Sequence, residues 1–206
     1  MASVKPDMVT IDLTLRKSNK SHEKAMTQAD ELLEELKKTV EAAGFDKDAL
    51  KTASFNVEAE YESECDERGI YREKFKGYAC IHRLKLEFDF DKEMLSKALS
   101  AVAQCVAEPE IYVRFTVKNK DSVDEKLLEN AARNAHEKAR ILAAASGVKL
   151  GKLVSIEYGQ KDDSVFSQTE LVAPNKCMRA MGKAMADINP ENIEMSDSAV
   201  FTWEIE

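Results

Sequence analysis

The chain has 206 residues, of which 44% are hydrophobic and 33% charged, and its net charge is −8. These totals describe a globular protein with a sizeable core, and they exclude a general nucleic-acid binder because no basic surface is evident that could displace counterions from phosphates. Seven glycines and four prolines argue against long disordered stretches. No run approaches the ~18 apolar residues that a membrane-spanning helix needs.

The cysteine usage and the first residues bear on the compartment. Four cysteines are scattered without a C-x-x-C pair, namely Cys65, Cys80, Cys105 and Cys177. Such spacing is typical of free thiols in a reducing compartment, and the opening MASVKPDMVTIDL has no apolar signal core. The sequence as given therefore predicts a cytoplasmic location, whereas a periplasmic or cell-envelope location implies that a leader has been removed.

The first half of the chain alternates strand and helix patterns. Apolar residues at every second position predict a strand over 9–15, and three- and four-residue steps predict a helix over 25–40 that ends at Gly44. A second strand over 55–61 leads through a polar loop around Gly69 to a long return strand over 78–90.

The second half continues with two more helices. Asp91 is expected to cap a helix that carries Leu95 to Val102, and a strand follows over 111–117. Ser122 and Glu125 form an S-x-x-E capping box for a long helix that runs to Ser146. The last predicted strands lie at 153–158 and at 199–206.

The resulting order, β-α-β-β-α-β-α-β-β, mixes antiparallel hairpins with helical crossovers. It predicts an α+β fold of mixed, largely antiparallel sheets with helices packed on them. We expect a single domain over 1–206, divisible into two α/β lobes. The stretch 160–195 is the exception, because it is a long connection that suggests an inserted arm with a short helix.

The stretch 129–158 raises the question of a phosphate loop. Phosphate loops run from strand to glycine-rich turn to helix, whereas here a helix precedes the glycines, so its carbonyl end faces them. Gly147 is better explained as a left-handed helix cap. The small residues at four-residue steps predict close packing of this helix on a sheet, with Ala135 and Ala139 buried; the complete stripe is Ala131, Ala135, Ala139 and Ala143.

One pair of residues suggests chemistry. Cys80 and His82 share a strand face, and two such ligands could begin a zinc site, although nothing designates a third and a fourth. The alternative is a buried cysteine beside a hydrogen-bonded histidine. His22 and His136 are far away in sequence, and no serine or cysteine nucleophile motif occurs. We therefore expect no enzyme, no cofactor and no metal.

The inserted arm suggests a contact. Met178, Met181 and Met185 fall on one helical face, roughly opposite three basic residues. Methionine stripes adapt to irregular partners. The helix either covers its own core as a lid or contacts another subunit or a protein partner.

Several segments together resemble the SIMPL domain family, formerly a domain of unknown function. They span nearly the whole chain, and two of them place residues of interest: FKGYACIHRLKLEF matches the family's Lys-Gly-Tyr strand with Gly77 and Tyr78, and LLENAARNAHEKARILAAASGVKLGKLVSI matches its helix and its turn with Gly147 and Gly151. The others are SVKPDMVTIDLTL, FDKDALKTASFNVEAEY and NPENIEMSDSAVFTWEIE.

The resemblance implies a function class. The family includes periplasmic antigens, an oxidative-stress defence protein and an adaptor that binds a pelle-like kinase; some bacterial members form large ring- or channel-like oligomers, and no catalytic residues are established. Members usually begin with a further strand before the Pro-Asp pair, which here stands close to Met1. The expected function is a non-enzymatic, self-associating scaffold or stress-related binding module. The alternatives are an enzyme or metal protein centred on Cys80 and His82, and an adaptor that binds through 160–195.

Overall fold

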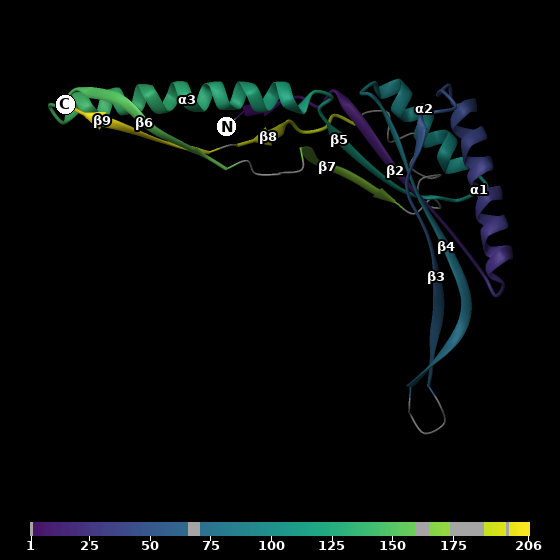
Figure 1. Cartoon of the computed structure of the whole chain (residues 1–206). Coiled ribbons are helices and arrows are strands. Elements are labelled where there is room, and N and C mark those ends of the chain that lie inside the picture. The colour runs from purple at the N-terminus through teal and green to yellow at the C-terminus, as the bar shows by residue number, and fades with distance from the viewer. Residues whose placement is uncertain (1, 66–70, 160–164, 174–187, 197) are drawn as a thin grey trace. The chain divides into compact units, whose positions relative to one another are not determined.

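The computed structural model describes residues 2–65, 71–159, 165–173, 188–196 and 198–206. The chain divides into two compact units, which are treated separately below: unit 1 comprises 1–6, 116–168 and 191–206, and unit 2 comprises 7–115 and 169–190. Figure 1 labels the elements. The helices among these residues are α1 (His22–Ala42), α2 (Lys92–Gln104) and α3 (Lys120–Ala145).

The strands confirm the α+β prediction and extend it. The predicted order is present, and three strands that the sequence patterns did not predict are added: β1, β7 and β8. The strands are β1 (Ala2–Val4), β2 (Met8–Asn19), β3 (Leu50–Cys65), β4 (Tyr71–Asp89), β5 (Glu110–Thr116), β6 (Leu150–Tyr158), β7 (Phe166–Ala173), β8 (Ile193–Met195) and β9 (Ala199–Ile205).

Unit 2 is built on a five-stranded sheet in the order β3-β4-β2-β5-β7. β2 and β4 pair antiparallel from Met8↔Asp89 to Asn19↔Tyr78, and β3 pairs antiparallel with β4. Residues 166–173, which belong to the stretch 160–195, form the edge strand β7 of this sheet.

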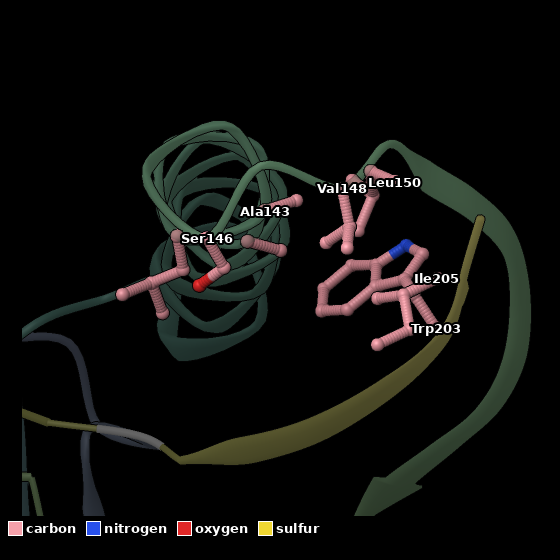
Figure 2. Close-up of a pocket in the computed structure, with 8 residues that line it drawn as sticks. Ala143, Ser146, Val148, Leu150, Trp203 and Ile205 are labelled. Carbon is pink, nitrogen blue, oxygen red and sulfur yellow. The ribbon is translucent and has the colours of Figure 1, made fainter.

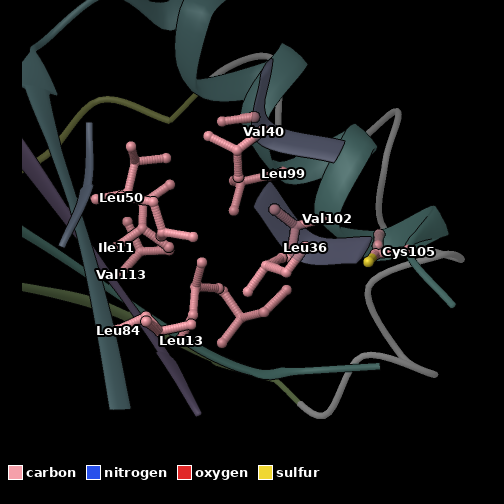
Figure 3. Close-up of a cluster of buried hydrophobic side chains, with 14 of the residues drawn as sticks. Ile11, Leu13, Leu36, Val40, Leu50, Leu84, Leu99, Val102, Cys105 and Val113 are labelled. Atoms are coloured by element: carbon pink, nitrogen blue, oxygen red, sulfur yellow. The ribbon is translucent and has the colours of Figure 1, made fainter. Parts of the chain in front are cut away.

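Helices α1 and α2 cover one face of that sheet and bury its core (Figure 3). The alternation of β2 is real: Ile11, Leu13 and Leu15 are buried, and polar residues between them turn the other way. Aliphatic side chains of both helices meet this face, including Leu36 of α1 and Leu99 of α2. The apolar residues at helical spacing in α1 and α2 and those at alternate positions in β2 therefore belong to one hydrophobic core.

The helix ends show how local sequence sets the boundaries. Asp91 caps α2, because its side chain accepts a hydrogen bond from the Glu93 N–H at 2.9 Å. The predicted capping box of α3 is wrong: α3 begins at Lys120, and Asn119 is its cap, with Oδ1 accepting from the Ser122 N–H at 3.0 Å. Asparagine is as good a cap as serine, and it stands three residues earlier.

Both long helices end in the same motif. Gly44 and Gly147 follow the last turns of α1 and α3 with φ of 99° and 74°. After α3, the Val148 N–H donates to the Ala143 carbonyl at 3.0 Å, and the Gly147 N–H donates to the Ala144 carbonyl at 3.2 Å. This is the hydrogen-bond pattern of a Schellman cap, in which glycine takes the left-handed position.

Unit 1 has a much smaller buried core. Its buried cluster consists of Val117, Val165 and Ile193. The strands β1 and β8 form one antiparallel pair, and β6 and β9 form another. Of the 26 residues of α3, only Leu127 and Ala143 are buried.

Candidate functional site

Cys80 and His82 lie where the sequence predicts, on one face of β4. Both are buried, and Cys80 packs against Ala25 and Ala29 of α1. The His82 Nε2 lies 3.2 Å from the Thr52 hydroxyl, whereas Nδ1 is buried and has no hydrogen-bond partner among the described residues. Only one of the two ring nitrogens of His82 therefore has the hydrogen-bond partner that was expected for a buried histidine.

The electrostatics of this pair favour neutral groups. Burial raises the pKa of the Cys80 thiol, and Asp30 adds to that rise. Burial also lowers the pKa of His82, an effect that Asp30 partly opposes. A reactive cysteine requires a lowered pKa and access to solvent, and Cys80 has neither.

The metal alternative needs more ligands than this pair provides. Within residues 2–65, 71–159, 165–173, 188–196 and 198–206, no three His, Cys, Asp or Glu side chains are grouped so that they could hold a metal ion. His22 instead contacts Tyr78 edge-on at 5.3 Å, and His136 contacts Trp203 at 6.4 Å. The structure brings none of the other histidines to Cys80 and His82.

Polar and apolar residues of the five-stranded sheet line a hollow of about 400 Å³. In it, Arg114 donates to Asp12 Oδ2 from Nε at 3.0 Å and from Nη2 at 2.5 Å. The guanidinium also lies 5.4 Å from the ring centre of Tyr112, whose pKa is raised by a hydrogen bond with Glu170. These charges pair with one another, so the hollow is explained as sheet structure.

The alanine stripe of α3 lies less deep than predicted. Ala135 and Ala139 are half-buried, and only Ala143 is fully buried. Beyond the helix, Gly151 lies so close to β9 that an added Cβ would meet Glu204 at 3.0 Å. Small residues at both places let α3 and β6 come close to the neighbouring strand.

The strands β6 and β9 form a two-stranded ribbon beside α3. Leu150 pairs with Ile205, and Leu153 pairs with Trp203. The ring of Trp203 stacks on Phe201 at 5.6 Å. Trp203 and Ile205 stand two residues apart and therefore share one face of β9.

A groove lies between this ribbon and the end of α3 (Figure 2). It has a volume of about 260 Å³, slightly below the ~300–1,000 Å³ that is typical of small-molecule pockets. Seven of its eight lining residues have apolar or aromatic side chains, and Ser146 contributes a hydroxyl. The residues of this ribbon groove are Ala139, Leu142, Ala143, Ser146, Val148, Leu150, Trp203 and Ile205.

Large apolar side chains remain exposed on the ribbon and on the last turns of α3. Leu142 and Ile205 are each 67% exposed, and Val154 and Val200 are each 60% exposed. Exposed apolar side chains in such number are common on surfaces that proteins use for interactions. The full set on α3, β6 and β9 is Ile141, Leu142, Leu153, Val154, Ile156, Tyr158, Val200 and Ile205.

The sequence patterns did not reveal this exposed surface, because each of its apolar residues could equally belong to a buried core. The alternation in AVFTWEIE predicts a strand with one buried face, and nothing in it shows that the ribbon has only two strands. The sequence instead favoured Met178, Met181 and Met185, which lie outside the described residues. Gly77 and Tyr78 are in β4: Tyr78 contacts Phe75 edge-on at 5.2 Å, and Gly77 is buried.

Comparisons with known proteins identify relatives. The SIMPL family, described as a protein of unknown function (DUF541), matches residues 1–203. A 26 kDa periplasmic immunogenic protein of Brucella melitensis is 24% identical over 156 residues, which are 76% of this chain and 62% of that protein. The protein of the same name in Brucella abortus gives the same identity and coverage.

A third relative covers slightly more of the chain. The uncharacterized protein YggE of Edwardsiella ictaluri is 27% identical over 178 residues, which are 82% of this chain and 68% of that protein. Of the two Brucella proteins, by comparison, the chain spans 62% of the length. The family match extends over nearly every residue, so the chain belongs to the SIMPL family.

Proposed function

We propose that this chain is a non-enzymatic, self-associating protein, a scaffold or stress-related binding module, and that a second copy binds the exposed apolar surface of α3, β6 and β9. The observation that supports the proposal is that surface. Eight large apolar side chains are exposed on these three elements. Covering them with another copy removes apolar area from water, at roughly 25 cal/mol per Å².

The open edges of the ribbon favour the same conclusion. Among the described strands, β6 and β9 pair only with each other, so each has one edge without a strand partner. Unpaired strand edges readily accept another chain, and proteins usually cover or charge them. Here the neighbouring side chains are mostly apolar.

The charge distribution also favours self-association at this place. Residues 133–158 and 199–206 carry five basic and four acidic side chains, a net charge of +1, in a chain whose net charge is −8. Copies of an acidic protein repel one another least where the local charge is close to zero. Self-association at the ribbon therefore brings together a part of the molecule whose net side-chain charge is close to zero.

The lack of enzymatic activity and the compartment belong to the same proposal. The neutral, buried states of Cys80 and His82 argue against nucleophilic chemistry at the one pair that suggested it.

The cytoplasmic expectation gains no support from the relatives, because two of them are named periplasmic. No helix in the described part of the chain is long and apolar enough to cross a membrane. We propose a periplasmic location, which fractionation of cells that express the native gene would test.

Sedimentation velocity over a wide range of protein concentration tests the self-association. We expect the wild-type sedimentation coefficient to rise with concentration, and Leu142→Lys to keep the protein monomeric because it places a charge in the contact. Val106→Lys is the matched control: Val106 is 81% exposed but lies after α2 in unit 2. A wild-type chain that stays monomeric at every concentration contradicts the proposal.

A further inference from the structure

Helix α1 packs on the sheet of unit 2 through two separate clusters of buried apolar side chains. Its second half contributes Leu36 and Val40 to the main core. Its first half contributes Ala25 and Ala29, which pack against Cys80 of β4 in a cluster of their own. Alanine buries much less apolar area than leucine or valine, so the first half of the helix is held more weakly than the second.

His82 lies on β4 between these two clusters. The buried side chains on this side of the strand are Cys80, His82 and Leu84 in order, so an imidazole separates the small cluster from the main core. The neighbours of His82 in the sheet are apolar, namely Leu15 of β2 and Phe55 of β3, and the Phe55 ring meets the imidazole edge-on at 5.1 Å. A titratable group thus separates the two places at which α1 is attached.

A proton on His82 is poorly accommodated in this packed state. In the imidazolium both ring nitrogens are donors, whereas only Nε2 has a partner among the described residues, the Thr52 hydroxyl at 3.2 Å. Burial accordingly lowers the pKa of His82. A buried charge with an unpaired donor costs more than the same charge in water, so protonation favours any state in which the ring reaches solvent.

The charged groups that face His82 do not remove this cost. α1 contributes Asp30, whose charge opposes the effect of burial on the pKa of His82, and Lys37, whose charge adds to it. Lys17 of β2 pairs with Cys80 and therefore stands on the same side of the sheet. The two side chains of β3 that contact the ring, a threonine and a phenylalanine, are uncharged. One exposed carboxylate thus faces two ammonium groups.

We infer that His82 is an acid-sensitive switch for the first half of α1, residues 22–31: protonation of its imidazole detaches these residues from β4 and exposes Cys80 to solvent. The second half of the helix stays packed, because its leucine and valine side chains belong to the main core. Cys80 is 1% exposed before the change, and the side chains that cover it come from the half that detaches. The switch works within a single copy of the chain and does not depend on the proposed self-association.

Detachment should increase as the pH falls. His82 has its ordinary pKa near 6.5 when it is exposed and a lower pKa when it is buried. Above about pH 6.5 the detached fraction is therefore independent of His82, and between the two pKa values it rises by up to about tenfold per pH unit.

Thiol labelling tests the switch, with Cys105 as an internal standard. Cys105 is also buried but belongs to the main core, so global unfolding exposes both thiols, whereas detachment of 22–31 exposes Cys80 alone. The wild-type chain is treated with 4,4′-dithiodipyridine, which reacts with thiols at acidic pH as well, and peptide mass spectrometry gives the rate at each cysteine. The ratio of the two rates cancels the pH dependence of thiol reactivity. We expect the ratio of the Cys80 rate to the Cys105 rate to rise about three- to tenfold from pH 7.5 to pH 5.5.

Three variants separate the switch from other causes. His82→Leu removes the titratable group and should abolish the rise. His22→Gln is the matched control and should keep it, because His22 is exposed at the start of α1, where its ring contacts Tyr78. Asp30→Asn is an exposed substitution that carries little risk to folding. It should enlarge the rise, because it removes the carboxylate that favours the buried imidazolium.

The opposite results overturn the inference. A ratio that falls with pH would mean that the imidazolium draws Asp30 closer and tightens the helix, and a constant ratio would mean that His82 does not control it. A rise that survives in His82→Leu, or that disappears in His22→Gln, assigns the effect to another group. A rise in Asp30→Asn that is no larger than in the wild type also contradicts the inference, and this variant decides the matter if His82→Leu does not fold.

Discussion

His82 links the stability of unit 2 to pH. Its pKa is lowered by burial, so the unfolded chain, with an ordinary pKa near 6.5, binds the proton first as the pH falls. The contribution of His82 to stability is therefore complete above about pH 6.5 and decreases below it, down to the lowered pKa of the folded state. We expect urea unfolding midpoints to fall between pH 7.5 and pH 5.

The variant His82→Leu separates the pH dependence of stability that His82 causes from the pH dependence that the carboxylates cause. Leucine keeps the site apolar and cannot titrate, so the variant should lose less stability than the wild type over the same pH interval. His136→Gln is the control, because His136 is exposed on α3. Identical pH dependence in the wild type and in His82→Leu would show that His82 is protonated as easily in the folded state as in the unfolded one.

Gly77 is required by the close approach of two strands. A Cβ at this position would lie 2.6 Å from the carbonyl oxygen of Asn19, which is backbone and cannot swing away. Gly77→Ala must displace the end of β2, and we expect a loss of about 1–3 kcal/mol in the free energy of unfolding. Gly159→Ala is the control, since an added Cβ there meets nothing within 4 Å. Equal unfolding free energies for both variants would contradict this account.

At the scale of elements, the packing of α3 on the ribbon depends on small side chains at different depths. Both Ala139 and Ala143 line the ribbon groove, but Ala143 is only 6% exposed whereas Ala139 is half-buried. Ala143→Leu should cost about 1–3 kcal/mol because the Ala143 side chain is almost completely covered by its neighbours. Ala139→Leu should cost less, since its side chain can enter the groove. Thermal unfolding of both variants measures the two losses of stability. A larger loss for Ala139→Leu than for Ala143→Leu would mean that α3 is rotated about its axis relative to this structure.

The elements differ in how well the sequence predicted them. Long amphipathic segments such as β2 and α1 were predictable, because the alternation of 9–15 and the helical period of 25–40 are continuous over several repeats. β1 and β8 are three residues each and carry no period to detect. β7 was missed because its residues 166–173 alternate poorly and lie in a stretch whose polar start suggested a loop.

The candidate site was less predictable for a related reason. A sequence pattern shows which residues avoid water, but not whether enough structure is present to cover them. Phe201 and Trp203 have the spacing of a buried strand face, and only the two-stranded pairing of β6 and β9 shows that apolar side chains around them stay exposed.

At the scale of the whole molecule, the two units differ in how much of their stability can come from their own cores. Among the residues that the structure describes, the main cluster of unit 2 holds 19 buried residues, whereas the cluster of unit 1 holds Val117, Val165 and Ile193. A helix with only two buried residues gains little from its own unit. Binding of another copy to the folded ribbon would stabilise it by mass action.

This difference predicts that protection from hydrogen exchange depends on protein concentration in one unit only. Amides of 139–158 and 199–206 should exchange more slowly as the concentration rises, because assembly removes the locally open states of α3 and the ribbon. Amides of β2 and β4 between Val9 and Phe88, which are held by the core of unit 2, should exchange at a rate that does not change with concentration. The measurement is mass-spectrometric exchange at two concentrations on either side of the assembly midpoint, with Leu142→Lys as the control that stays unprotected at both. Protection of the ribbon that is equal at both concentrations in the wild type would mean that α3, β6 and β9 are stable without a partner.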